Sequence, residues 1–68
     1  MAKVKVPKAV LDALEAVRRS GLTNMLDRPV VAELAEEFGF EEAAHWIRTR
    51  RRDYAVGFFH GFTATEDK

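Results

Sequence analysis

The longest helical pattern in the chain is EEAAHWIRTRRRDYAVGFFH, residues 41–60. Its apolar residues recur every three or four positions, the spacing that lines one face of a helix. They are Ala43, Ala44, Ile47, Tyr54 and Phe58, with Trp46 on the flank. Glu41 and Glu42 lie in the first turn, where negative charge is favourable, and Gly61 follows the last residue. The pattern predicts one long helix over residues 41–60.

Two shorter helical patterns precede this one. Apolar residues at the same spacing predict helices over residues 7–20 and 28–38. Gly21 is placed to end the first helix in a left-handed conformation, and Asp27 to cap the start of the second. The expected fold is therefore all-α: a compact three-helix domain over residues 7–61, in which the third helix is the longest.

The two ends of the chain carry no helical pattern. Residues 1–6 alternate lysine with valine, and we expect a flexible arm because a short strand there has no evident partner. Residues 62–68 are expected to be a flexible tail. Gly57 weakens a helix by about 1 kcal/mol relative to alanine, so the third helix is expected to bend or fray near it.

The composition excludes several classes of protein. The 68 residues include 11 Lys and Arg and 11 Asp and Glu, a zero net charge that disfavours a globally basic nucleic-acid binder. The absence of cysteine excludes disulfides, thiolate zinc sites and a cysteine nucleophile. No apolar run approaches the roughly 20 residues of a membrane span, and the first residues lack the apolar stretch of a signal peptide. We therefore expect no membrane association and a cytoplasmic location.

Several residues beyond Gly21 match the motifs of a known family. They are Gly21, Thr23, Asn24, Met25 and Asp27, then Gly39, Phe40, Glu42, Ile47, Tyr54 and Gly61. On these residues the chain resembles a domain-of-unknown-function family of short bacteriophage and prophage proteins. Leu26 and Trp46 stand where that family usually has phenylalanine. The resemblance implies a phage or prophage origin and an accessory role, and it implies no particular activity.

A basic cluster lies in the middle of the predicted third helix. On a continuous helix Arg48, Arg51 and Arg52 share a face, and their guanidinium groups are candidates for contacts with phosphates or carboxylates. An opposing acidic set lies on the second helix and at the start of the third. It comprises Glu33, Glu36, Glu37, Glu41 and Glu42. This segregation favours ion pairing between helices or between chains over contact with nucleic acid.

Two further patterns carry chemistry in other proteins. The run from Leu34 to Phe40 has the local shape of a helix-turn-helix, but Glu41 and Glu42 would then face DNA phosphates, which disfavours DNA readout. The spacing of Glu42 and His45 is that of carboxylate di-iron bundles, yet a partly exposed histidine is the favoured interpretation. We expect no metal, no cofactor and no catalytic set, and hence no enzyme.

The loop motif consists of Thr23, Asn24, Met25 and Asp27. Asn24 is expected to fix the path of the loop through hydrogen bonds. Met25 and Leu26 are expected to cover one end of the helical core. The alternative is that they form an adaptable docking plug for another protein.

The aromatic end of the third helix is the most informative anomaly. Phe58 and Phe59 lie 100° apart on a helix and cannot both face one narrow core. A chain of this length also buries only about 60% of its unfolded surface, so a second chain is a plausible way to complete the core. We predict a partner interface at Trp46, Phe58, Phe59 and Phe62.

Together these observations predict a non-enzymatic protein-interaction module. It is expected to form a homodimer through the aromatic end of the third helix and to bind an unidentified host or phage protein. The alternative is a nucleic-acid-binding accessory protein that uses the arginine face of the same helix, a role that the acidic residues disfavour.

Overall fold

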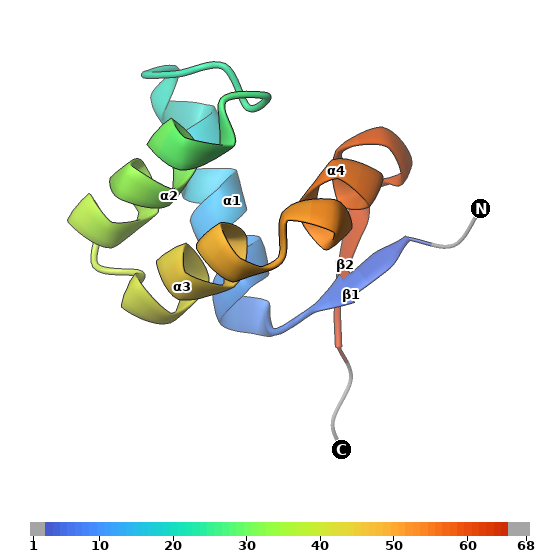
Figure 1. Ribbon diagram of the computed structural model, residues 1–68. Helices are drawn as coiled ribbons and strands as arrows, with labels where there is room; N and C mark the ends of the chain where they lie inside the picture. Colours follow the sequence, from blue (N-terminus) through green and yellow to red (C-terminus); the bar gives the residue numbers. More distant parts are fainter. Residues whose placement is uncertain (1–2, 66–68) are drawn as a thin grey trace.

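The computed structural model describes residues 3–65. These residues form four helices and two short strands. In chain order they are β1 (Val4–Val6), α1 (Lys8–Ser20), α2 (Arg28–Glu37), α3 (Glu41–Thr49), α4 (Arg51–His60) and β2 (Phe62–Ala64). Helices α1, α2 and α3 pack together on one side, and α4 lies beside the two strands on the other (Figure 1).

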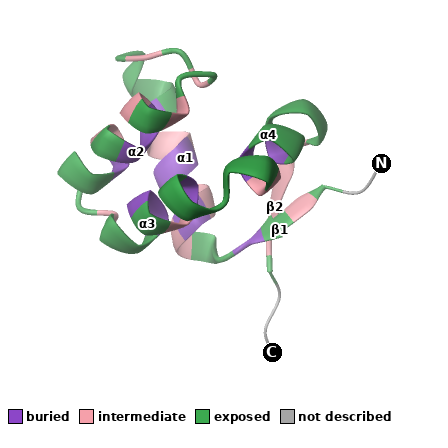
Figure 2. Ribbon diagram, in the orientation of Figure 1, coloured by how far each residue is buried: buried purple, intermediate pink, exposed green. Residues whose placement is uncertain are grey.

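The core lies mainly between the first three helices, where small side chains allow close approach (Figure 2). Its fully buried residues on these helices include Val10, Ala13, Val17, Val31, Ala32, Ala35, Ala43 and Ile47. Gly21 ends α1 with φ 67° and ψ 14°, the left-handed cap expected there. Gly39, at φ 92°, makes the turn from α2 into α3. Helices α1 and α2 thus lie within one residue of their expected ranges.

The three-helix prediction is wrong, because the helix expected over residues 41–60 is two helices. The chain leaves helical geometry at Arg50, with φ −116° and ψ 61°. The Thr49 hydroxyl donates a hydrogen bond to the carbonyl of His45 at 2.8 Å, a contact that often bends helices. A continuous helix would also place Arg48 one turn from both Arg51 and Arg52, and like charges at that spacing are destabilising.

The all-α prediction also fails, because β1 and β2 pair as a parallel two-stranded sheet. Val4 lies opposite Phe62, and Val6 opposite Ala64. Nothing near residues 1–6 in the sequence offers a partner for a strand, because the partner lies at the opposite end of the chain. Residues 1–2 and 66–68, the outer parts of the expected arm and tail, lie outside the described residues.

The strands close against the helices through one buried valine and one buried glycine. Val6 is completely buried in the core. Helix α4 continues through Gly57 without fraying, and the ring of Phe62 packs directly on that glycine. Gly61, at φ 99°, then turns the chain from α4 into β2. The C-terminal half of α4 is therefore held on its inner side and faces solvent on its outer side (Figure 2).

Candidate functional site

The aromatic residues of the predicted interface divide into an inner and an outer group. Trp46 and Phe62 are half-buried and pack against the core. Their rings meet edge to face, with centroids 6.3 Å apart and planes at 75°. Phe62 also packs on Tyr54, at 5.9 Å between centroids. This inner group fastens β2 to α3 and α4.

The outer group projects from the last two turns of α4. Phe59 is 77% exposed and Phe58 is 39% exposed, and their rings meet edge to face at 5.5 Å. Leu26, in the loop between α1 and α2, is 62% exposed and lines the same hollow of about 180 Å³. We call Leu26, Phe58 and Phe59 the apolar patch. Phe58 and Phe59 are the part of the predicted interface that faces solvent.

A larger cleft of about 330 Å³ adjoins the patch, between α1, the α1–α2 loop and α4. Its walls are mostly apolar and include Leu11, Leu14, Met25, Tyr54, Phe58 and Phe62. Its charged lining residues are Glu15 and Arg18, which pair with each other at 2.9 Å. The Arg18 and Arg19 guanidinium groups hold the pKa of Glu15 below its usual value, so this carboxylate is charged at neutral pH. Phe58 borders both the cleft and the smaller hollow.

Tyr54 joins α4 to the loop at the floor of this surface. Its hydroxyl donates a hydrogen bond of 2.6 Å to the carbonyl oxygen of Met25. Tyr54 is only 4% exposed, and this burial raises the pKa of its hydroxyl to about 12, with Arg28 acting weakly in the opposite direction. The phenol therefore keeps its proton at neutral pH and serves as a structural tie.

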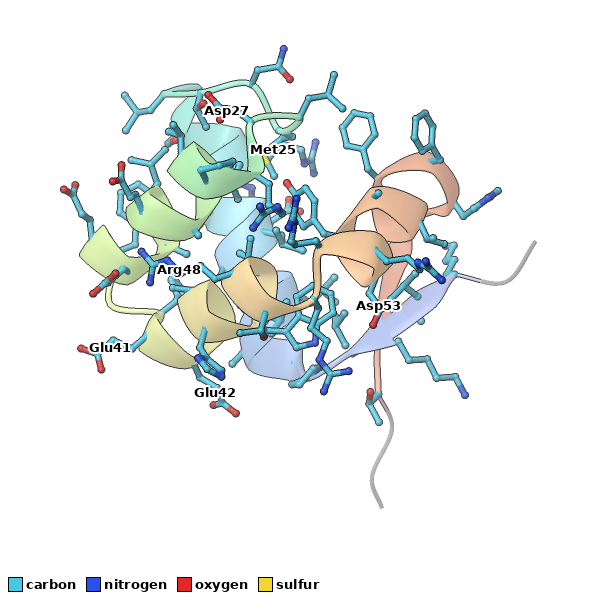
Figure 3. The ribbon with its side chains drawn as sticks, viewed as in Figure 1. Met25, Asp27, Glu41, Glu42, Arg48 and Asp53 are labelled. Atoms are coloured by element: carbon cyan, nitrogen blue, oxygen red, sulfur yellow. The ribbon has the colours of Figure 1, made fainter. Side chains whose placement is uncertain are left out.

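The loop motif is ordered by its own hydrogen bonds. Asn24 Oδ1 accepts from the backbone N–H of Leu26 at 2.9 Å, and the Asn24 carbonyl accepts from the N–H of Asp27 at 2.9 Å. Met25 turns inward, from the loop toward the core and α4 (Figure 3). Leu26 turns outward, although the sequence analysis expected it to cover the core. Asp27 occupies the N-cap position of α2 without a capping hydrogen bond from its side chain, and Thr23 makes only a 3.5 Å contact with the Asn24 carbonyl.

The arginines of the predicted phosphate-binding face are not equivalent. Arg48 pairs with Glu36 at 2.9 Å and so links α3 to α2 (Figure 3). Arg51 and Arg52 lie beyond the helix break, are exposed, and form no ion pair within residues 3–65. The break therefore divides the continuous face that the sequence predicted. Arg51 lines the hollow beside the apolar patch, a position that the sequence analysis did not anticipate.

The acidic start of α3 lies apart from the apolar patch. Glu41, Glu42 and His45 are all exposed, and the two carboxylates sit at the end of α3 that is remote from α4 (Figure 3). In the described part of the chain, no three histidine, cysteine or acidic side chains gather as a metal site would need. No helix in residues 3–65 combines the length and apolar character needed to cross a bilayer.

Glu15 was not among the predicted interface residues, and Leu26 entered only through the alternative of a docking plug formed with Met25. The available signal for Leu26 was an apolar side chain between the turn-forming residues Asn24 and Asp27. Glu15 carried no signal, because its place beside the cleft depends on how α1 packs against α4.

Comparison with known proteins places the chain in a family. The family model described as "Domain of unknown function (DUF5049)" matches residues 7–60, from the start of α1 to the end of α4. No curated protein and no solved structure matches the chain. Because the family model covers well over half of the sequence, the chain belongs to the DUF5049 family.

Proposed function

We propose that the chain is a non-enzymatic protein-interaction module that self-associates through the apolar patch at the aromatic end of α4. The observation that carries this proposal is the 77% exposure of Phe59 beside Phe58 and Leu26. Isolated apolar residues on a surface are ordinary, but contiguous aromatic patches usually mark protein interfaces.

Energetics support the same conclusion. Complete burial of a phenylalanine side chain is worth about 1.5–3 kcal/mol, and a small domain has a core of limited size. Phe59 is mostly exposed and Phe58 is partly exposed, so both rings keep apolar surface that their own chain does not bury. A second copy that covered both rings would supply burial that the single chain lacks.

The test is the molar mass in solution, measured by sedimentation equilibrium over a micromolar concentration series. The native chain is expected to dimerise, and Phe59→Ser to shift the equilibrium to monomer. Phe38→Ser is the matched control, because Phe38 is 40% exposed at the end of α2, away from the patch. A native chain that stays monomeric and folded throughout the series would overturn the proposal. Equal loss of dimer in both variants would also count against it.

We further propose that this module acts in the cytoplasm as an accessory protein of a phage or prophage, and that it binds a host or phage protein. The support is the resemblance carried by the Gly21–Asp27 motif. Induction of a prophage in the source strain should then raise the transcript, and fractionation should recover a tagged chain with cytoplasmic proteins. Constant expression and recovery with the envelope would contradict this part of the proposal.

The alternative, a nucleic-acid-binding accessory protein, has weaker support. Arg51 and Arg52 are exposed and form no ion pair among residues 3–65, but Glu36 already engages Arg48. Such a protein should bind labelled DNA or RNA with an affinity that falls steeply as salt rises. Reversing Arg51 and Arg52 to glutamate should abolish that binding. Absence of binding at low salt would remove this alternative.

A further inference from the structure

The surface around α4 contains both a projection and a hollow. The edge-to-face pair of Phe58 and Phe59 forms a ridge, and the cleft of about 330 Å³ lies along one side of it. A two-fold symmetric interface requires one surface patch to be complementary to itself. A ridge beside a hollow of apolar character meets that requirement, because the ridge of each copy can lie against the hollow of the other.

Charged residues line both hollows. Glu15 lines the larger cleft on the α1 side together with Arg18, and its carboxylate pairs with Arg18 and Arg19. Arg28 lines the smaller hollow. Arg51 lines the smaller hollow on the α4 side, is exposed, and forms no ion pair within the described residues. Phe58 borders both hollows, so a two-fold axis that passes near Phe58 and runs between the two hollows turns the α1 side of one copy toward the α4 side of the other. The Glu15 carboxylate of each copy then lies opposite the Arg51 guanidinium of the other.

The available area is adequate for the centre of an interface. The exposed fractions of Leu26, Phe58 and Phe59 correspond to roughly 300 Å² of apolar surface, since such side chains present about 150–250 Å² each. A standard interface covers about 800 Å² per partner, which is about one sixth of the 4713 Å² surface of this chain. The apolar patch thus has the size of the apolar centre of an interface, and the more polar surface around it would form the rim.

We infer that the occupant of the cleft is a second copy of this chain, docked by its Phe58–Phe59 ridge so that Glu15 of each copy faces Arg51 of the other. The inference rests on the proposed self-association and specifies its geometry. Each dimer contains two such pairs, related by the two-fold axis. The dimer is therefore stronger when position 15 of one chain and position 51 of the other carry opposite charges, and weaker when they carry like charges.

The experiment is a charge exchange between two singly substituted chains. Glu15→Lys alone places two cations opposite each other at both edges, and Arg51→Glu alone places two anions there. Each variant should dimerise about tenfold or more weakly than the native chain, because attraction becomes repulsion twice. A mixture of the two variants should form a heterodimer of near-native affinity, since both of its pairs again have opposite charges. Fluorescence anisotropy with one labelled chain measures all three affinities.

Matched controls separate this geometry from general effects of charge. Asp12→Lys makes the same charge change on α1, and Arg52→Glu makes it on α4, but neither residue lines the cleft or the hollow. Both controls should dimerise within about threefold of the native chain. Glu15→Lys also removes the pairs with Arg18 and Arg19, so circular dichroism must show that the variant stays folded. If Glu15→Lys unfolds, the double variant with Glu15→Gln and Arg51→Glu in one chain replaces it. This chain should dimerise more tightly than Arg51→Glu alone, because the neutral glutamine at position 15 no longer repels the glutamate at position 51 of the other copy.

The outcomes distinguish the inference from the proposal beneath it. A monomeric native chain refutes self-association itself. A native dimer that depends on Phe59, but shows no recovery in the mixture or the double variant, refutes this geometry and leaves self-association through the patch intact. Equal weakening by the Asp12 and Arg52 controls also refutes the pairing. Recovery in the mixture, with both controls near native, supports it.

Discussion

Replacement of Gly57 by alanine tests the contact that fastens β2 to α4. An ideal Cβ at position 57 would lie 2.6 Å from Cδ1 of Phe62 and closer still to two further ring carbons. Carbon atoms in contact normally lie about 3.5–4.0 Å apart, so the nearest part of the ring has to move by about 1.5 Å. Trp46 and Tyr54 pack against that ring, at 6.3 Å and 5.9 Å between centroids, and they restrict where it can go.

Two effects of opposite sign determine the result. In a helix, alanine is favoured over glycine by about 1 kcal/mol. Overpacking of a filled site costs about 1–3 kcal/mol, and a displaced phenyl ring also gives up part of the roughly 1.5–3 kcal/mol that full burial is worth. We expect Gly57→Ala to lower the free energy of unfolding by about 1–2 kcal/mol, which in a domain of this size lowers Tm by about 4–8 °C per kcal/mol.

A double-mutant cycle with Phe62→Ala isolates the cause. In the Phe62→Ala background the ring is absent, so Gly57→Ala should raise the free energy of unfolding by about 1 kcal/mol. Urea denaturation followed by circular dichroism measures each corner, and the fluorescence of Trp46 reports displacement of the neighbouring ring. The expected coupling is about 2–3 kcal/mol. If alanine at position 57 has the same effect in both backgrounds, the ring does not pack on Gly57 and the reasoning fails.

Three further predictions follow from hydrogen bonds and ion pairs. Tyr54→Phe should cost about 1 kcal/mol in urea denaturation, because the Met25 carbonyl loses its donor. The pKa of Tyr54 is about 12, above the ordinary value of 10, so its contribution to stability is complete below pH 10 and is lost as pH rises toward 12. The Tyr54→Phe variant should therefore lose less stability than the native chain between pH 10 and pH 12. Asn24→Ala should lower the free energy of unfolding by about 0.5–1.5 kcal/mol, whereas Asn24→Asp, which keeps the acceptor, should cost less. A double-mutant cycle on Arg48 and Glu36 should give a coupling below about 1 kcal/mol that falls with salt, as for other exposed pairs.

The sequence predicted the positions of α1 and α2 because their signals are local. Apolar residues at helical spacing and the glycine at position 21 act within a few residues of the structure they specify. The start of α3 at Glu41 was predicted for the same reason. Each of these boundaries depends on backbone conformations that the local side chains favour.

The errors arose where distant contacts decide the structure. Apolar periodicity continues across Arg50, so the pattern alone predicted one helix over residues 41–60. Beyond the break, the Tyr54 hydroxyl donates to the Met25 carbonyl, a contact between residues 29 positions apart. The parallel pairing of Val4 with Phe62 joins the two ends of the chain and has no local signature. Both features depend on contacts between residues far apart in the sequence, which the local spacing of apolar residues does not reveal.

The helix break also explains why only part of the aromatic surplus faces solvent. The break turns α4 away from the axis of α3, so the inner side of α4 packs against Met25 and β2. Tyr54 is buried there and bonds the Met25 carbonyl, and the Phe62 ring packs on Gly57. Phe59, and part of the Phe58 ring, then remain exposed on the same helix. Folding and the proposed association thus draw on different aromatic residues, although the sequence presents them as one cluster. Substitution of Phe62 should therefore destabilise the fold, whereas substitution of Phe59 should weaken association and leave the free energy of unfolding of the single chain nearly unchanged.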